Sequence, residues 1–372
     1  MAANTDIIPV ISVSDFAELA ADRLKYHKRL REQGLEPLER VRPLMLLGAP
    51  GGGKTHATLS MIKEEGASYI MTQDGNYSLP DFVGVPSIAT HEVTKQGMTV
   101  FNPPEMIQAA HESQVLDIWM HDDFTDAPNS IQNAMCGMVY DAVACGFKID
   151  PYALHILTGN LPEHKAGANA VISKLLNRAM VFIAAQDGEG TVRYFMTQED
   201  MDPDTVAFLH WKGDDAIYGK EGFDPRYAIN NTPRQWAAVA RLPAPDFTDR
   251  VSVHKYTQQA SALVRKGEVA ELVAFRKLIN DPAFVPIEKI VADPEGAPVP
   301  DKIDVCYALG SRLLQSIKET KHFEHSMRYI SRLRPEPQTW FVNACVKLLP
   351  QVQGTRAYIN WARTNKTYFT GR

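Results

Sequence analysis

The chain has 372 residues, of which 45% are hydrophobic and 22% are charged, and its formal net charge is −5. This composition is ordinary for a globular protein and excludes an intrinsically disordered chain, and the length predicts two or three packed units. The negative charge gives no general basic excess for binding nucleic acid, although a local basic patch stays open.

Short sequence features disfavour a zinc- or disulfide-stabilised protein, a protein with a signal peptide and a membrane-spanning protein. No two cysteines form a C-x-x-C pair, so we expect buried free thiols rather than a zinc site or a disulfide framework. The cysteines are Cys136, Cys145, Cys306 and Cys345. Residues 1–6 show no basic region followed by an apolar run, and no stretch approaches the ~20 apolar residues of a membrane-spanning helix. We therefore expect a cytoplasmic protein without membrane insertion.

The first part of the chain shows a helical pattern followed by a short apolar run. Residues 11–35 predict a helix that Ser14 caps and Gly34 ends. Residues 43–47 are apolar and lead into a glycine-rich turn, which is typical of a buried strand. Residues 54–65 predict the helix that follows this turn.

Residues 69–72 predict a second strand, and a long segment rich in Gly, Pro, Thr and Val follows at 75–104. Because a loop of this length is usually functional or has structure of its own, we expect a hairpin within it. Short apolar runs and helical patterns then alternate: a strand at 115–120, a helix at 128–144, a strand at 154–157, a helix at 170–178 and a strand at 180–184. This alternation predicts an α/β fold with a parallel sheet covered on both faces.

The strand signal fades from about residue 199. Residues 204–211 and 232–241 predict helices, and the remaining chain has helical stretches separated by turns, with a proline-rich connector at 281–301. The expected organisation is a helical lead-in at 1–40, an α/β core at 41–198, a helical lid at 199–245 and a helical C-terminal region of unassigned role at 246–372.

One glycine-rich loop matches the pattern G-x-x-x-x-G-K-[ST] in full. It lies between an expected strand and an expected helix, which is the context in which this pattern cradles nucleotide phosphates. The glycines let backbone N–H groups turn toward the phosphates, Lys54 is expected to reach the β- and γ-phosphates, and the Thr55 hydroxyl is expected to bind Mg²⁺. We therefore expect ATP and Mg²⁺ to bind at Gly48, Ala49, Pro50, Gly51, Gly52, Gly53, Lys54, Thr55 and His56.

Polar residues at two strand ends complete the expected site. The run at 115–120 leads into Asp122 and Asp123. Because an acidic residue on a neighbouring strand completes the magnesium site of P-loop ATPases, we expect Asp122 to bind Mg²⁺ and Asp123 to polarise the attacking water. Asn160 follows the strand at 154–157, where its amide is expected to orient the same water. Solvated turn residues are the plainer interpretation of all three.

Two arginines are expected to act on the phosphates. Arg178 ends the short helix at 170–178, and an arginine offered to the γ-phosphate of a neighbouring subunit stabilises transition-state charge. Arg234 opens the helix at 232–241, from which we expect it to contact phosphates bound to its own chain. A surface salt bridge is the alternative for Arg178.

These motifs, in this order, resemble the AAA+ superfamily and, within it, the MoxR and dynein-related branch. The similarity runs from about residue 41 to about residue 242, roughly half of the chain. It includes the segment Leu79–Gly84, an inserted hairpin expected at Thr90–Asn102, and a D-E-x-x-x-A-P-type motif that reads Asp122–Pro128 here. The resemblance does not extend to the C-terminal helices.

The resemblance implies roles for individual residues. Asn160 would be the sensor asparagine, Arg178 the arginine finger, and Arg234 the second sensor. Two positions depart from the family: Asp123 stands where Glu is normal, and Asp126 where a basic residue is common. Since catalytic geometry is sensitive at about the 1 Å level, the shorter carboxylate predicts slow turnover.

AAA+ proteins usually form rings, commonly hexamers, with ATP at the subunit interfaces. The resemblance therefore implies a homo-oligomer that binds ATP and releases ADP. MoxR-like ATPases often work with a separate von Willebrand factor A domain protein to remodel a protein client, which is our leading hypothesis. The segment at 75–104 is the expected partner contact.

Two alternatives stay open. Basic and aromatic residues interleave in the tail, a pattern typical of nucleic-acid binding, which favours a helicase- or clamp-loader-like role. The basic residues are Lys318, Lys321, His322, His325, Arg328, Arg332, Arg334, Arg356, Arg363, Lys366 and Arg372, and the aromatic residues are Tyr329, Trp340, Trp361 and Tyr368. A solvated helix face with core aromatics is the plainer interpretation. Asp123 in place of Glu also allows a third hypothesis, an ATP-gated scaffold with little hydrolysis.

Overall fold

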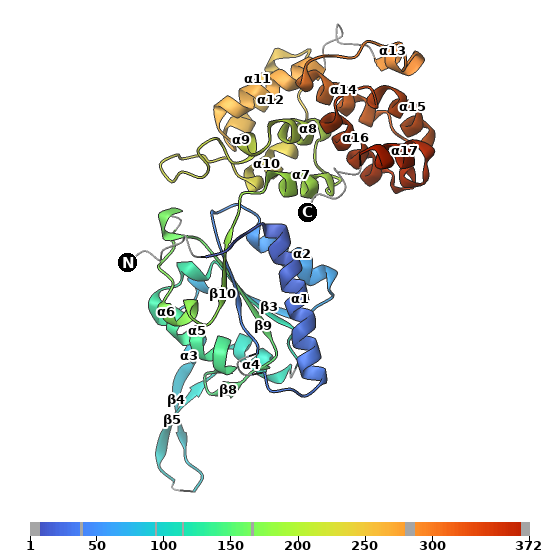
Figure 1. The fold of residues 1–372 in the computed structure, drawn as a ribbon. Helices are drawn as coiled ribbons and strands as arrows, with labels where there is room; N and C mark the ends of the chain where they lie inside the picture. The colour runs from blue at the N-terminus through green and yellow to red at the C-terminus, as the bar shows by residue number, and fades with distance from the viewer. Residues whose placement is uncertain are drawn as a thin grey trace. The chain divides into compact units, whose positions relative to one another are not determined.

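The computed structural model describes residues 8–37, 40–93, 95–113, 115–164, 167–279 and 287–365. The chain forms two compact units, Met1–Gln186 and Asp187–Arg372 (Figure 1). A parallel sheet with covering helices makes up the first unit, and the elements described in the second are helical. The predicted fold class, an α/β P-loop core followed by helical regions, is confirmed. None of the described helices is both long and apolar enough to cross a membrane.

The sheet of the first unit has six parallel strands within the described residues. Their order is β1 (Val10–Ile11), β10 (Met180–Ala184), β2 (Leu44–Leu47), β9 (Leu154–Gly159), β6 (Ile118–Asp122) and β3 (Tyr69–Gln73). Strands β2, β9 and β6 are buried along their whole length, which is why their sequences are nearly continuous apolar runs. Because β9 lies between β2 and β6, the turn after β9 lies between the phosphate loop and the acidic strand end.

Helices cover both faces of this sheet (Figure 1). On one face are α1 (Val13–Glu32) and α2 (Lys54–Glu64), and on the other are α4 (Glu105–Glu112), α5 (Asn129–Asp141) and α6 (Ser173–Leu176). Phe16 and Ile62 are buried in the first of these layers, and Ile107 and Ile131 in the second. Burial of such apolar side chains is the main favourable term in folding.

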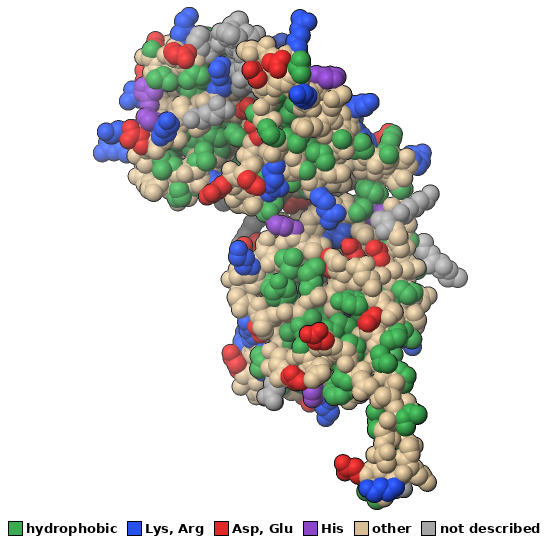
Figure 2. Space-filling model, turned by 180° about the vertical axis from the view of Figure 1, so that it is seen from behind, with side chains coloured by type: hydrophobic (Ala, Val, Ile, Leu, Met, Phe, Trp, Pro, Cys, Tyr) green, Lys and Arg blue, Asp and Glu red, His purple; other side chains and the backbone are tan. Residues whose placement is uncertain are grey.

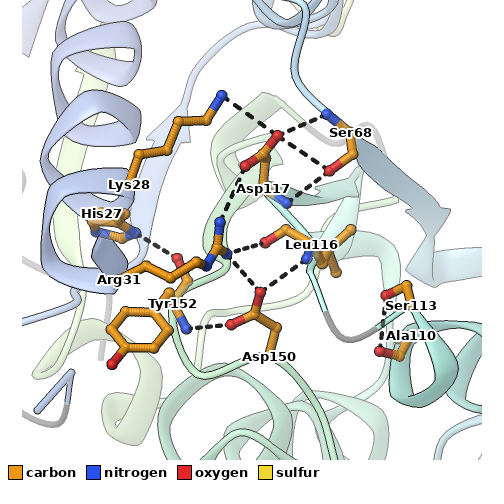
Figure 3. Close-up of polar contacts among 10 residues, drawn as sticks. All are labelled: His27, Lys28, Arg31, Ser68, Ala110, Ser113, Leu116, Asp117, Asp150 and Tyr152. Carbon is orange, nitrogen blue, oxygen red and sulfur yellow. Dashed lines mark hydrogen bonds and ion pairs between the residues drawn. The ribbon is translucent and has the colours of Figure 1, made fainter. Parts of the chain in front are cut away.

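Helix α1 is anchored where strands β6 and β9 begin. Arg31 donates to Asp150 at 2.5 Å and to the Leu116 carbonyl at 3.1 Å, and it lies 3.4 Å from Asp117 (Figure 3). Lys28 adds an ion pair with Asp117 at 3.5 Å. Asp117 precedes β6 and Asp150 precedes β9. These contacts therefore hold the amino-terminal ends of the two strands, opposite to the carboxyl ends where the phosphate loop lies.

The cap of α1 differs from the prediction. The Ser12 side chain, not that of Ser14, accepts the backbone N–H of Asp15 at 3.0 Å, and Ser14 lies inside the first turn. Both serines precede the apolar-periodic residues, so the pattern alone did not separate them. Gly34 follows the helix with φ +61°, which suits a glycine at a helix end.

A two-stranded hairpin protrudes from the first unit (Figure 1). It consists of β4 (Val85–Thr90) and β5 (Gly97–Asn102), and the short helix α3 (Pro80–Val83) precedes it. The predicted hairpin exists, but its predicted start at Thr90 is wrong, because the ladder already begins at Val85. The run Val85–Thr90 contains a proline and little alternation, which hid its strand character.

Hydrophobic side chains line this hairpin and charged ones lie at its tip (Figure 2). Ile88 is 87% exposed and Val93 is 84% exposed. The two paired strands contain no Asp, Glu, Lys or Arg. The paired strands of the hairpin therefore present several apolar side chains to solvent.

The second unit packs its helices around one hydrophobic core. Phe208 and Trp236, from the region predicted as a lid, share this core with Trp340 and Phe341 from the predicted C-terminal region. The finer division of the chain at 198 and 245 stays a prediction. The helices are α7 (Gly188–Met196), α8 (Pro203–Lys212), α9 (Asp214–Ile217), α10 (Pro233–Ala240), α11 (Arg250–Ser261), α12 (Lys266–Ile279), α13 (Ile287–Ala292), α14 (Ile303–Gln315), α15 (Thr320–Ile330), α16 (Pro335–Leu348) and α17 (Arg356–Thr364).

Short elements complete the described chain. They are the strands β7 (Val143–Ala144) and β8 (Phe147–Lys148) and the 3-10 helices η2 (Asp74–Asn76), η3 (Phe124–Asp126), η4 (Pro162–His164) and η5 (Pro350–Gly354). The predicted connector at 281–301 contains α13, and its residues 281–286 lie outside the described ranges.

Candidate nucleotide-binding site

The phosphate loop joins β2 to α2, as predicted. Gly51 and Gly53 have φ angles of +77° and +92°, in a backbone region that residues other than glycine rarely adopt. Gly53 is the N-cap residue of α2 and supplies no capping side chain, so the first N–H groups of the helix are available to an anion. Gly48 is needed for packing, because a Cβ there would lie 2.7 Å from the Cβ of Ala184 in β10.

Lys54 folds back over this loop. It is only 6% exposed, and its Nζ donates to the carbonyl oxygens of Gly48 at 3.0 Å and Ala49 at 2.9 Å. A third bond, of 3.2 Å, runs to the amide oxygen of Asn160. The ammonium group is thus held by neutral oxygens that phosphate oxygens can replace.

The expected metal ligands lie together. The Thr55 hydroxyl donates to Asp122 Oδ1 at 2.6 Å, and the Thr158 hydroxyl donates to the same oxygen at 2.5 Å. Asp122 is 4% exposed. One hydroxyl and one carboxylate beside a phosphate loop fit Mg²⁺, which takes oxygen ligands and is usually completed by water and substrate phosphates. The described residues contain no group of three or more His, Cys, Asp or Glu side chains that could hold a metal without such help.

Asn160 connects the phosphate loop to the acidic strand end. While its amide oxygen accepts from Lys54, its Nδ2 donates to Asp123 Oδ1 at 3.4 Å. Asp123 has φ +47°, in the left-handed region, which Asp tolerates better than most residues. The structure therefore brings together five of the predicted residues, Lys54, Thr55, Asp122, Asp123 and Asn160.

Three residues of this arrangement were not predicted. Thr158 holds Asp122, the Thr125 hydroxyl accepts the backbone N–H of Asn160 at 2.9 Å, and the Asn169 backbone N–H donates to the Thr125 carbonyl at 2.6 Å. Thr158 stands two residues before Asn160, on the strand that separates β2 from β6. A signal for Thr158 existed in this polar strand end, but the contacts of Thr125 and Asn169 depend on tertiary packing.

Asp126 adds a third carboxyl near the site. Burial, and then the negative charges of Asp123 and Asp122, raise the pKa of the Asp126 carboxyl above its usual value. A Cβ added to Gly75 would lie 2.7 Å from the Cβ of Asp126, so the turn before α3 packs tightly against the acidic motif. A third carboxyl therefore lies near Asp122 and Asp123, where its ionised form is disfavoured.

The comparisons with known proteins describe similarity at the level of the fold. No protein-family model matches the chain, and no curated protein sequence matches it. A solved structure of NtrX from Brucella abortus is 13% identical, with 89% of this chain and 65% of the NtrX chain covered and a TM-score of 0.34. The chain therefore spans slightly less than two thirds of NtrX.

Two structures of RuvB from Thermotoga maritima are each 14% identical to the chain. A mutant form covers 82% of this chain and 86% of its own with a TM-score of 0.37. A form described as a Holliday junction branch migration motor covers 80% and 81% with a TM-score of 0.32. All three scores are below 0.5, so the similarities assign neither a family nor a function.

The contacts described above do not involve three of the predicted site residues. Arg178 is exposed after α6, with its guanidinium 5.2 Å from the centroid of the Tyr140 ring. His56 is exposed on α2, and Arg234 is exposed on α10 in the second unit. Their predicted contacts with nucleotide stay predictions.

Three aromatic residues in the described part of the tail are not available for stacking on bases. Tyr329 is 0% exposed, Trp340 1% and Trp361 5%, and all three belong to the core of the second unit. Tyr368 lies outside the described ranges, as do Lys366 and Arg372. The interpretation of this pattern as a solvated helix face over core aromatics therefore fits the described part of the tail.

Proposed function

We propose that the chain is an Mg-ATP-dependent ATPase of the AAA+ type, in the MoxR-like branch, that remodels a partner protein. The observation that carries the proposal is the convergence of polar groups at the carboxyl ends of β2, β6 and β9. Lys54 contacts Asn160, which contacts Asp123, and Thr55 contacts Asp122, all within hydrogen-bonding distance. These are the groups that phosphate binding, metal binding and water activation require.

Each group has a distinct role in this proposal. The loop N–H groups and Lys54 hold the β- and γ-phosphates, and Thr55 and Asp122 would hold the magnesium ion. When bound, the ion neutralises charge that develops on the phosphate oxygens. Asp123 accepts a proton from the attacking water, and Asn160 orients that water through its amide. This part of the proposal uses only side chains that already lie within one another's reach.

Assembly would complete the site. Arg178 is exposed and contacts the ring of Tyr140, so it is available to a neighbouring subunit. A guanidinium inserted beside the γ-phosphate of another copy would stabilise the transition state, and Arg234 would serve as a second sensor within its own chain. We therefore propose a homo-oligomeric ring, commonly a hexamer in this class, that exchanges ATP for ADP.

The hairpin β4–β5 would contact the client. Its exposed apolar side chains include Ile88 and Val93, and an isolated two-stranded hairpin is only marginally stable by itself. Exposed apolar surface of this kind typically marks a binding site. We propose that nucleotide-dependent movement of the acidic strand end is passed to the hairpin through the turn at Gly75, and that the client is presented by a separate von Willebrand factor A domain protein.

One observation favours a second candidate. Asp123 stands where the family normally has Glu, so an ATP-gated scaffold that assembles and hydrolyses little would keep every binding group described above. A helicase- or clamp-loader-like role receives less support, since Tyr329, Trp340 and Trp361 are buried. Salt-dependent DNA binding would favour that third role, because phosphate contacts weaken steeply with salt.

Steady-state ATP hydrolysis of the wild type, Lys54→Ala and Arg178→Ala tests the proposal, with the assembly state recorded with and without ATP. We expect the wild type to hydrolyse ATP, Lys54→Ala to be inactive, and Arg178→Ala to lose turnover but keep ATP binding. A wild type that binds ATP and assembles without hydrolysis would support the scaffold instead. Normal turnover by Arg178→Ala would remove the arginine-finger role.

A further inference from the structure

Thr125 joins the acidic motif to the strand end that carries Asn160. It is completely buried in η3, two residues after Asp123, and its hydroxyl accepts the backbone N–H of Asn160 at 2.9 Å. The side-chain amide of Asn160 contacts both Lys54 and Asp123. The bond from Thr125 therefore fixes the backbone from which that amide projects.

The packing around Thr125 leaves little freedom for η3. A Cβ added to Gly159 would lie 2.5 Å from Cγ2 and 2.8 Å from Oγ1 of Thr125. The Thr125 carbonyl accepts the Asn169 N–H at 2.6 Å, and the Asn169 side chain donates to the carbonyls of Asp126 at 3.2 Å and Ala127 at 3.3 Å. The turn is thus held by β9 through a hydroxyl and by Asn169 through the backbone.

We propose that Thr125 is a positioning residue for hydrolysis, whose hydroxyl sets the separation between Asp123 and Asn160. The inference rests on the proposed ATPase function and adds a residue that acts through the two groups proposed to hold the attacking water. A merely structural hydroxyl would satisfy one buried N–H, and its loss would affect stability and nucleotide binding. A positioning hydroxyl instead controls kcat and leaves nucleotide affinity unchanged.

Paired substitutions separate these two roles. Thr125→Val keeps the shape of the side chain but removes the acceptor, and Thr125→Ser keeps the acceptor. Thr72→Val is the matched control, because Thr72 is 1% exposed in β3 and its hydroxyl accepts from Trp119 Nε1 at 3.4 Å. Thr72 lies opposite His121 in the neighbouring strand β6. Because successive side chains of a strand alternate, His121 and Asp122 point to opposite faces of the sheet, so Thr72 does not face the proposed site. For each protein we would measure kcat for ATP, the Kd for ADP and the thermal unfolding temperature.

We expect Thr125→Val to bind ADP like the wild type while its kcat falls by about tenfold to a hundredfold, the effect of a misplacement of about 1 Å. Thr125→Ser and Thr72→Val should keep kcat near the wild-type value. Wild-type kcat in Thr125→Val would overturn the inference, as would parallel loss of ADP binding and kcat in Thr125→Val with no recovery in Thr125→Ser. If Thr125→Val does not fold, Thr125→Ala replaces it in the comparison with Thr125→Ser.

The same experiment distinguishes this inference from the proposed function. A wild type without ATP turnover overturns both. A wild type that hydrolyses ATP beside an unaffected Thr125→Val overturns only the role of Thr125.

Discussion

Asp123→Asn isolates the proposed general base, because it removes a charge and changes little else. Asn has the same shape as Asp and also tolerates the left-handed backbone, here φ +47°. Burial, and then the charge of Asp123, disfavour the ionised form of the Asp126 carboxyl and raise its pKa. The substitution removes the repulsion that comes from Asp123. We therefore expect the free energy of unfolding to change by less than about 0.5 kcal/mol, or to rise slightly.

The effect on catalysis should be much larger than the effect on stability. A positioned general base contributes typically ~10²- to 10⁴-fold to a rate, and an amide cannot accept the proton. Asp123 is held by a 3.4 Å contact with Asn160, which is long for a hydrogen bond, so the lower end of this range applies. We expect kcat to fall about 100-fold, which corresponds to about 2.7 kcal/mol of transition-state stabilisation. ATP affinity should persist, because the phosphate loop and Asp122 are unchanged.

The assay is phosphate release at saturating ATP, together with ADP affinity and urea unfolding of the same proteins. Asp126→Asn is the matched control, since Asp126 belongs to the same motif. It should keep kcat near the wild-type value. Wild-type turnover by Asp123→Asn would refute the general-base role, and an equal loss in both variants would show that the total charge of the motif matters rather than a base at Asp123.

Two further predictions concern stability. Arg276 is 1% exposed, forms an ion pair with Asp202 and donates to Thr205 at 3.0 Å, and its guanidinium lies 4.9 Å from the centroid of the Tyr256 ring. Because Arg276→Ala would leave the largely buried Asp202 unpaired, we expect it to lower the free energy of unfolding of the second unit by about 3–5 kcal/mol, measured by urea unfolding. Lys277→Ala, on the exposed side of the same helix, should change stability by less than about 0.5 kcal/mol, and similar losses in both variants would contradict this reasoning. Burial lowers the pKa of His27 to about 4 from 6.5, so the neutral imidazole is favoured in the folded protein and the stability it contributes is present above pH 6.5 and lost as the pH falls toward 4. This shift in pKa corresponds to about 3 kcal/mol in the free energy of unfolding. In urea unfolding at pH 7, 5 and 4, the free energy of unfolding of His27→Gln should depend less steeply on pH than that of the wild type. Equal slopes would exclude His27 as the titrating group.

Strands β2 and β9 could be predicted because they are buried on both faces, and the half-buried β10 because its residues form a continuous apolar run. The runs at 43–47, 154–157 and 180–184 are apolar without alternation, and each corresponds to a parallel strand of the structure. Strand β1 has two residues, and its pairing with β10 depends on long-range contact that local sequence does not reveal. Helices α4 and α7 were not predicted because their amphipathic patterns are short, and α4 directly follows the segment interpreted as a loop.

The members of the candidate site were predicted better than their contacts. The pattern around Lys54 and the acidic pair Asp122 and Asp123 is local in sequence, and its chemistry follows from residue type. The bonds made by Thr125 and Thr158 join segments that are 35 and 36 residues apart, so they follow from the strand order rather than from any motif. The contact between Lys54 and Asn160 joins residues that are far apart in the chain, so no local motif predicted it.

The aspartate at position 123 is best understood together with its backbone. A residue at φ +47° projects its side chain differently from one in extended strand geometry, so carboxylate reach cannot be judged from side-chain length alone. Most side chains pay about 1–2 kcal/mol for left-handed backbone, a cost from which Asp and Asn are largely exempt because their short polar groups bond locally. The turn that brings the Thr125 hydroxyl to the backbone N–H of Asn160 therefore also favours Asp over Glu at position 123. In this view the shorter carboxylate belongs to the geometry of η3, and it is compatible with hydrolysis as long as Thr125 holds Asn160 within reach of it.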